Sequence, residues 1–105
     1  MRGWQVSPTE LEATLLMHPC IVDAAVVGLK RSIESNDGEL PRAYVVLGLG
    51  AILTDVQVMT FIGKRLARFK ALSGGVSFVA SIPRNGSGKI MRRLLIQQDP
   101  IVSNT

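Results

Sequence analysis

Cysteine, histidine and long apolar runs are scarce in this sequence, and each shortage excludes a class of protein. The single cysteine, Cys20, cannot form an internal disulfide or a cysteine metal cluster. The single histidine, His18, excludes a zinc site with two histidine ligands. No apolar run reaches the roughly 20 residues of a membrane-spanning helix, and the N-terminus has no apolar core of a signal peptide. The sequence therefore predicts a small soluble domain without disulfide, metal site or membrane span.

Acidic residues are scarce in the second part of the chain. Residues 60–105 carry eight basic side chains and one acidic one, whereas residues 1–59 carry four basic and seven acidic ones. Such a bias is typical of a solvated basic face, or of a protein with an anionic partner such as a nucleic acid or a phosphorylated small molecule. The five aromatic residues do not alternate with the basic ones as stacking platforms for nucleic acid do. We therefore expect no nucleic-acid partner, although a basic binding module stays open as an alternative.

The length of 105 residues predicts a single domain, and capping and turn residues predict its elements. Ser7-Pro8-Thr9-Glu10 has the order of a capping box at a helix start, and Pro19 ends that helix. The connection between the first two strands is too short for a helical crossover, so we expect them to be antiparallel. We predict helices at 8–18, 54–69 and 89–98 and strands at 22–29, 42–47 and 76–80. This order indicates an α+β fold, a small, mostly antiparallel three-stranded sheet with about three covering helices, and a disordered tail at 99–105.

The most informative segment is the loop 83–89, which reads Pro-Arg-Asn-Gly-Ser-Gly-Lys. A strand, a glycine-rich loop, a Gly-Lys pair and a helix are also the context of a phosphate-binding P-loop. That pattern requires a serine or threonine after the lysine, and a glycine five residues before the second glycine. Ile90 and Pro83 stand at these positions, so the loop is not a Walker site.

Lys89 follows a small and flexible tether formed by Gly86, Ser87 and Gly88. A lysine in this setting is often an ordinary solvated side chain of a surface loop. Its long arm can also reach into a cleft of another domain and offset negative charge between a carboxylate and a phosphate. The loop alone does not decide between these two interpretations.

Five segments, in the right order, resemble the C-terminal domain of adenylate-forming acyl/aryl–CoA ligases. The segments are residues 3–12 (GWQVSPTELE), 18–28 (HPCIVDAAVVG), 38–46 (GELPRAYVV), 78–83 with Phe-Val and Ile-Pro, and 87–92 (SGKIMR). The first segment is most similar to the branch of 4-coumarate–CoA ligase and luciferase. Peptide-synthetase adenylation domains more often have another pattern after the first glycine. The resemblance covers residues 3–96.

This resemblance implies the mobile C-terminal domain of an ATP-dependent carboxylic acid–CoA ligase. A large N-terminal adenylation domain, absent from this chain, would bind ATP, Mg²⁺ and the acid, and the C-terminal domain would close over it. Lys89 would then bridge the carboxylate and the α-phosphate while the acyl-adenylate forms and pyrophosphate leaves. After a large rotation, Gly3, Trp4 and Gln5 would line the tunnel for the pantetheine arm of CoA, and the CoA thiol would attack the adenylate.

The resemblance also gives the basic residues a possible partner, because CoA carries a 3′-phosphate and a pyrophosphate. Candidate contacts are Lys64, Arg65, Arg68, Lys70 and Arg84. Basic residues at the end of a helix are equally explained by the helix dipole. The family commonly has Tyr-Lys where this chain has Phe69-Lys70, so no tyrosine hydroxyl is available there. We expect Arg92 and Arg93 to anchor the last helix instead.

We expect the isolated chain to fold without ligase activity and to bind neither ATP, Mg²⁺ nor CoA tightly. A cytoplasmic or peroxisomal location is expected. The chain shows no signal peptide, and it shows no C-terminal Ser-Lys-Leu-type address. Cys20 is interpreted as a small buried hydrophobic residue and His18 as a helix-end residue. Besides the basic binding module, one alternative stays open, the lid of a peptide-synthetase adenylation domain that serves a carrier protein.

Overall fold

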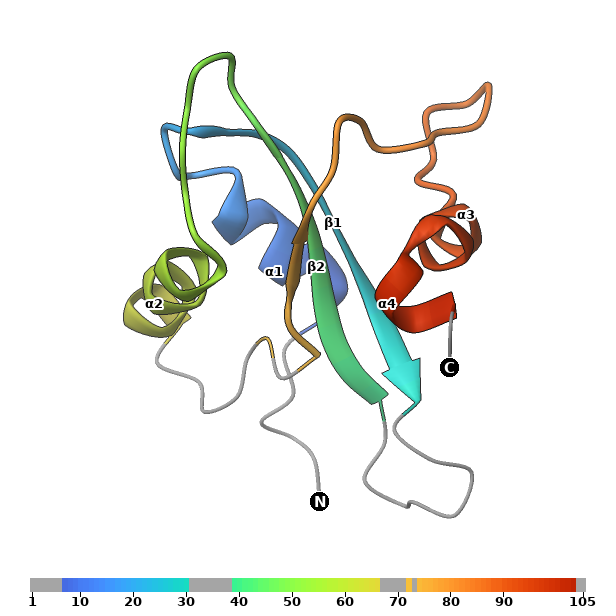
Figure 1. Cartoon of the computed structure of the whole chain (residues 1–105), viewed down its shortest axis with the longest axis horizontal. Coiled ribbons are helices and arrows are strands. Elements are labelled where there is room, and N and C mark those ends of the chain that lie inside the picture. Colours follow the sequence, from blue (N-terminus) through green and yellow to red (C-terminus); the bar gives the residue numbers. More distant parts are fainter. Residues whose placement is uncertain (1–6, 31–38, 67–71, 73, 104–105) are drawn as a thin grey trace.

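The computed structural model of this protein describes residues 7–30, 39–66, 72 and 74–103. The elements in chain order are α1 (Pro8–Leu15), β1 (Ile21–Lys30), β2 (Glu39–Leu47), α2 (Asp55–Leu66), β3 (Val76–Phe78), α3 (Arg92–Gln98) and α4 (Pro100–Ser103). Figure 1 shows the sheet in the middle of the molecule, with α1 and α2 on one side and α3 and α4 on the other. These elements form the α+β fold that the sequence predicts, a three-stranded sheet covered by helices.

The sheet has the strand order β1-β2-β3 and is mixed. β1 and β2 pair antiparallel along their whole length, as their short connection predicts. β3 pairs parallel to residues 43–45 of β2. The chain leaves β2, passes through α2 and returns in the same direction, and such a crossover joins parallel strands. The prediction of a mostly antiparallel sheet therefore describes the long pair of strands, whereas the short third strand is parallel.

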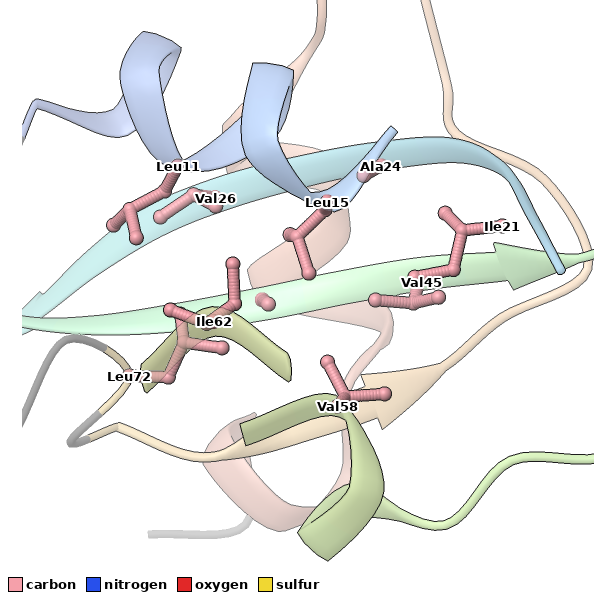
Figure 2. Close-up of a cluster of buried hydrophobic side chains, with 10 residues drawn as sticks. Leu11, Leu15, Ile21, Ala24, Val26, Val45, Val58, Ile62 and Leu72 are labelled. Carbon is pink, nitrogen blue, oxygen red and sulfur yellow. The ribbon is translucent and has the colours of Figure 1, made fainter. Parts of the chain in front are cut away.

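The core is divided between the two faces of the sheet, because successive side chains of a strand point to opposite faces. Ala24 and Val26 of β1 belong to the cluster under α1 and α2, whereas Ala25 and Val27 belong to the cluster under α3. Figure 2 shows the first cluster, in which side chains of α1 and α2 lie over the two long strands. Its buried members are Leu11, Leu15, Ile21, Ala24, Val26, Ala43, Val45, Val58, Ile62 and Leu72.

The second cluster contains Ala25, Val27, Tyr44, Ile82 and Leu95. Ile82 precedes the glycine-rich loop and Leu95 lies in α3 after it, and both are at least nine-tenths buried. Burying a large aliphatic side chain contributes about 1.5–3 kcal/mol to the free energy of unfolding. The two ends of the loop that carries Lys89 are therefore fixed to the sheet by packing.

The helix starts follow the capping patterns in the sequence. The Ser7 hydroxyl accepts a hydrogen bond from the Glu10 amide at 3.1 Å, at the start of α1. Before α2, the Thr54 hydroxyl accepts from the Gln57 amide at 3.1 Å, and the Gln57 side chain accepts from the Thr54 amide at 2.9 Å. This reciprocal pair is a complete capping box. The predicted end of this helix at Phe69 lies outside the described residues.

The end of α1 comes earlier than the sequence predicts. The helix ends at Leu15, whereas the pattern predicts His18. The amides of Met17 and His18 donate to carbonyls three residues earlier, so the chain tightens after Leu15. His18 Nδ1 then accepts a hydrogen bond from the Cys20 amide at 3.0 Å, which supports the interpretation of His18 as a helix-end residue.

The last part of the chain differs from the prediction in two ways. The final predicted helix begins at Arg92 rather than Lys89, because Ile90 forms an isolated antiparallel bridge with Arg84 and so has extended backbone. The sequence predicts a disordered tail at 99–105, but α4 covers Pro100–Ser103 and the Asp99 side chain is buried, while residues 104–105 lie outside the described residues. A buried ion pair, described below, holds this segment.

No helix in the described part of the chain is long and apolar enough to cross a membrane.

Candidate functional site

Lys89 lies in an exposed loop between β3 and α3 and close to the Arg84–Ile90 bridge. The Asn85 amide donates to the Lys89 carbonyl at 2.9 Å, and the Met91 amide donates to the Pro83 carbonyl at 2.9 Å. These bonds close the loop at its base. Lys89 therefore belongs to a hairpin-like loop and not to the first turn of a helix. Figure 1 shows this segment, in orange, reaching beyond α3 and away from the sheet.

The Lys89 side chain is exposed, and within the described residues no hydrogen bond or ion pair engages its ammonium group. An interior partner would have kept this charge from acting elsewhere. The sequence leaves open whether Lys89 is a solvated surface residue or a group that reaches another domain. The exposed position is compatible with both.

The Asn85 side chain organises the tip of the loop. Its Oδ1 atom accepts hydrogen bonds from the Ser87 amide at 2.9 Å, the Ser87 hydroxyl at 2.8 Å and the Lys89 amide at 3.0 Å. The Gly88 amide also donates to the Asn85 carbonyl at 2.9 Å. The glycine-rich segment is therefore more ordered than the flexible tether that its composition predicts.

Arg84 fixes the loop to the sheet from the other side. Its Nη1 atom donates to the Gly88 carbonyl at 3.2 Å, and its Nη2 atom forms an ion pair with Asp23 Oδ1 at 2.8 Å. Asp23 lies near the start of β1, beside a register irregularity in the pairing with β2. Both side chains stay about one-third exposed. The guanidinium that the sequence offers as a CoA contact is thus already engaged within this domain.

Arg92 fixes the chain after the loop. Its Nε atom donates to the Val26 carbonyl at 3.0 Å, and its Nη2 atom pairs with Glu12 Oε2 at 2.7 Å. The same carboxylate oxygen accepts from the Val26 amide at 2.8 Å. Glu12 and Arg92 therefore satisfy both backbone groups of Val26 at the outer edge of the sheet. The expectation that Arg92 anchors the last helix is confirmed, whereas Arg93 is exposed.

Gly88 is the one glycine of the loop with a left-handed backbone, at φ +87°. A Cβ atom added to Gly86 or Gly88 would have nothing within 4 Å. The two glycines therefore differ in backbone conformation, whereas both have room for a side chain. The left-handed conformation costs other residues about 1–2 kcal/mol.

We expect Gly88→Ala to lower the free energy of unfolding of the chain by about 1 kcal/mol, because alanine is strained at positive φ. Gly86→Ala is the matched control, and we expect a change of less than about 0.5 kcal/mol. Urea denaturation followed by circular dichroism measures both. Equal effects of the two substitutions would contradict the left-handed conformation at Gly88.

A second polar cluster is buried under α4 and was not found from the sequence. Asp99 Oδ2 accepts from Arg42 Nε at 2.7 Å and from the Tyr44 hydroxyl at 2.6 Å, and the Ile101 amide donates to Asp99 Oδ1 at 3.0 Å. Arg42 and Asp99 are 5% and 4% exposed. Arg42 Nη1 also donates to the Gly74 carbonyl at 3.1 Å. The cluster ties β2 to the C-terminal segment.

The charges of this cluster support one another. Burial disfavours the Asp99 carboxylate, but the hydrogen bonds from Tyr44, Arg42 and Ile101 outweigh it and lower the pKa of Asp99 below its ordinary value. Burial and the hydrogen bond to Asp99 raise the pKa of Tyr44 to about 12. Burial also opposes the charge on Arg42, yet contacts with Asp99 and Tyr44 raise its pKa. The cluster is thus a salt bridge with a neutral tyrosine, and it serves the fold.

The remaining site predictions fall into two groups. Lys64 is exposed at the end of α2, and Arg65 lies over the Phe61 ring, with its guanidinium carbon 4.3 Å from the ring centroid. Both positions are compatible with contacts to phosphate but do not require them. The other predicted contacts lie outside the described residues: Gly3, Trp4, Gln5, Arg68 and Lys70.

The described part of the chain has no group of three or more histidine, cysteine, aspartate or glutamate side chains placed to hold a metal ion. Cys20 is a free and partly buried thiol, so its expected small-hydrophobe role is met only in part. The site therefore consists of one exposed lysine, the loop residues that position it, and two ion pairs, Arg84–Asp23 to β1 and Arg92–Glu12 to α1, that fix the chain on either side of the lysine.

Comparisons with known proteins show the family and the fold of this chain. The chain is 50% identical over 100 residues to the acyl-CoA ligase ppsA of Aspergillus oryzae, which covers 94% of this chain and 18% of that protein. It is 45% identical over 93 residues to 4-coumarate–CoA ligase-like 2 of Arabidopsis thaliana, with 89% and 16% covered. The structure of ATP-bound MatB from Rhodopseudomonas palustris superimposes with a TM-score of 0.71 at 34% identity and covers 86% of this chain and 17% of that one.

The chain thus spans less than a fifth of the length of these relatives. A family model described as the C-terminal domain of AMP-binding enzymes matches residues 10–89, which is most of the chain and ends at Lys89. The first of these relatives is named an acyl-CoA ligase, and the second is named after 4-coumarate–CoA ligase, the branch that the N-terminal motif resembles. The chain therefore belongs to the family of C-terminal domains of AMP-binding enzymes, within the acyl-CoA ligase group.

Proposed function

We propose that this chain works as the mobile C-terminal domain of an AMP-forming carboxylic acid–CoA ligase and that Lys89 is its catalytic residue for acyl-adenylate formation. The observation that supports this role is the Lys89 side chain, exposed and unpaired within the described residues, on a loop whose backbone is fixed. A large N-terminal domain is the proposed partner and would bring ATP, Mg²⁺ and the acid.

The first half-reaction explains why an ammonium group is needed. A carboxylate oxygen of the acid attacks the α-phosphorus of ATP, a new P–O bond forms, and the bond to pyrophosphate breaks. Two anions must approach each other in this step. A lysine ammonium placed between the carboxylate and the α-phosphate lowers the barrier by offsetting their repulsion where negative charge develops. Lys89 has the reach for this role because it extends from a projecting tip.

The second half-reaction transfers the acyl group to CoA. The thiolate sulfur attacks the acyl carbon, the thioester forms, and AMP leaves with the electron pair of the broken C–O bond. Gly3, Trp4 and Gln5 are the proposed walls of the pantetheine tunnel, with Gln5 next to the reacting thiol. Their role is based on the family resemblance, because they lie outside the described residues.

The proposed contacts to the phosphates of CoA are Lys70 and Arg84. Arg84 already pairs with Asp23 and the Gly88 carbonyl, so contact with a phosphate would have to use its remaining exposed surface. The geometry favours Arg84 as a residue that holds the loop. Lys70 is then the stronger candidate of the two.

The acceptor is tested by supplying different thiols to the full-length protein that carries this domain. We expect thioester formation with CoA, ATP and a carboxylic acid, and none with the pantetheine arm of a carrier protein in place of CoA. Product formation is followed by mass spectrometry. Transfer to the carrier protein, without transfer to CoA, would instead support a peptide-synthetase lid.

The isolated chain of 105 residues is the second arm of this test. It carries Lys89, but within the described residues it has no group of side chains placed to hold a metal ion. We expect no acyl-adenylate from the chain alone, measured by release of labelled pyrophosphate from ATP. Adenylate formation by the isolated chain would contradict the proposed division of labour between two domains.

A further inference from the structure

Two side chains outside the proposed catalytic set, Asp23 and Asn85, determine where the Lys89 backbone lies. Asn85 Oδ1 holds the Lys89 amide at 3.0 Å and both donors of Ser87 at 2.8 and 2.9 Å. Asp23 Oδ1 holds Arg84 Nη2 at 2.8 Å, and Arg84 Nη1 holds the Gly88 carbonyl at 3.2 Å. One set of contacts fixes the N–H and the other fixes the C=O of the same peptide group, the one that joins Gly88 to Lys89.

Asp23 is itself held in place by the sheet. The same Oδ1 atom accepts a hydrogen bond from the Ala24 amide at 2.9 Å. The pairing of β1 with β2 shifts register between Ile21 and Asp23. Such irregularities re-aim side chains and are common beside functional sites. The Arg84–Asp23 ion pair therefore fixes the loop relative to β1.

The location of these contacts argues against a role in stability alone. The side chains of Arg84 and Asp23 are 39% and 31% exposed. Exposed ion pairs contribute little to the stability of a protein. The contacts within the tip, from Asn85 to Ser87 and Lys89, are exposed as well. A network that adds little to stability and converges on one exposed lysine is suited to fix geometry.

We propose that Asp23 and Asn85 are positioning residues for Lys89, Asp23 acting through Arg84 on the Gly88 carbonyl and Asn85 acting on the Lys89 amide. This inference rests on the proposed function of Lys89. A lysine must be held close to its productive place because a misplacement of about 1 Å can cost about 100-fold in rate. The loop keeps the backbone of Lys89 fixed, so the ammonium group has fewer positions to search than it would have on a mobile loop.

The test measures both half-reactions of the full-length protein separately. We expect Asn85→Ala and Asp23→Ala to lower the rate of adenylation by roughly 10- to 100-fold. Thioester formation from preformed acyl-adenylate should stay within about two-fold, and so should the KM for ATP, because substrate binding is not altered. In the rate of adenylation, Arg84→Ala should match Asp23→Ala, and the double variant should adenylate no more slowly than the slower single variant, since both act through one contact.

Asp55→Ala is the matched control. Asp55 is exposed at the start of α2, and its carboxylate accepts from the next amide, Val56, at 2.8 Å, as Asp23 does from Ala24. Within the described residues, Asp55 has no ion pair with arginine. We expect Asp55→Ala to leave adenylation unchanged. Hydrogen exchange of the Ser87 and Lys89 amides gives a readout that does not depend on catalysis. Of these variants, Asn85→Ala should accelerate this exchange most.

Each outcome decides the matter. Selective loss of adenylation in Asp23→Ala and Asn85→Ala, with unchanged melting temperature, supports the proposal. If Lys89→Ala abolishes adenylation while Asp23→Ala and Asn85→Ala behave like Asp55→Ala, the positioning role is wrong and the function of Lys89 stands. Equal loss of both half-reactions together with a lower melting temperature shows a structural role and overturns the proposal. If Lys89→Ala leaves adenylation intact, both the proposed function and this inference fail.

Discussion

Lys89→Ala in the full-length protein is expected to slow acyl-adenylate formation by about 100- to 1000-fold, the range found when one group that stabilises developing charge is removed. The reason is that alanine leaves the approaching carboxylate and α-phosphate without the ammonium between them. Thioester formation from preformed acyl-adenylate should be largely spared, because in the proposed mechanism the domain would present another face in that step. Rapid-quench measurements of each half-reaction give the two rates.

Two controls separate this result from a general loss of function. Arg93→Ala removes another exposed charge close by, on the first turn of α3, and should leave both half-reactions within about two-fold. Gln5→Ala should show the reverse of Lys89→Ala, with slow thioester formation and nearly normal adenylation. An equal loss of both half-reactions in Lys89→Ala would count against its assignment to the first step.

Asp99→Ala is expected to have the largest effect on stability, a loss of about 3–5 kcal/mol in the free energy of unfolding. Arg42 is 5% exposed and Asp99 is its ion-pair partner at 2.7 Å. Removal of the carboxylate leaves a buried guanidinium without its counter-charge and the Tyr44 hydroxyl without its acceptor. Urea denaturation of the chain measures the loss. Asp55→Ala, which removes an exposed carboxylate, is the control and should change stability by less than about 0.5 kcal/mol.

The same carboxylate gives stability a defined dependence on pH. The pKa of Asp99 is lower in the folded state than its ordinary value of 3.8. The folded state therefore binds the proton more weakly than the unfolded state. The contribution of the Asp99 carboxylate to stability is complete above about pH 4, and it is lost as the pH falls below 3.8 and through the folded pKa of Asp99. We expect this acid-side loss to be much smaller in Asp99→Ala. Parallel pH profiles of the two proteins would show that another group is responsible.

Local patterns in the sequence predict most of the elements because the forces involved are local. The Ser7 cap and the Thr54–Gln57 capping box are contacts between residues three apart, and both are present. The alternation of β1 and β2 is likewise a property of neighbouring residues. The direction of β3 depends on how α2 crosses the sheet, which no local pattern specifies. The predicted end of α1 at His18 is wrong because the chain forms a tight turn before Cys20, and the helix ends at Leu15.

The Arg42–Asp99 pair is missed for a different reason. The two residues are far apart in sequence, and Asp99 stands in a polar segment whose composition is typical of a disordered tail. Only the fold brings this segment under β2. Two hints exist in the sequence. The first is that Arg42 and Tyr44 have the spacing of one face of a strand that is otherwise apolar. The second is that Asp99 is the only acidic residue after Asp55, which makes it the one available partner in that half.

The sequence proposes which residues belong to the candidate site, but it does not predict how they are arranged. The motif identifies Lys89 and its glycines, and the structure adds the residues that hold them. Asn85-Gly86 is a turn signal in the sequence, because asparagine side chains accept hydrogen bonds from amides two residues later. That signal predicts the bond from Ser87 to Asn85 and does not predict the additional bond from Lys89. The ion pair of Arg84 with Asp23 joins residues 61 positions apart and follows only from the packed fold.

The central claim, that an ammonium group at position 89 assists adenylation, is tested most directly by chemical rescue. Lys89→Cys removes the charge, and alkylation of the new thiol with 2-bromoethylamine restores an ammonium on an arm of lysine length. Treated wild-type protein controls for alkylation of Cys20 and any other cysteine. We expect adenylation to be low in Lys89→Cys and to recover after alkylation, while thioester formation stays constant throughout. Adenylation that is normal in Lys89→Cys, or that does not recover when mass spectrometry shows complete alkylation, would contradict the claim.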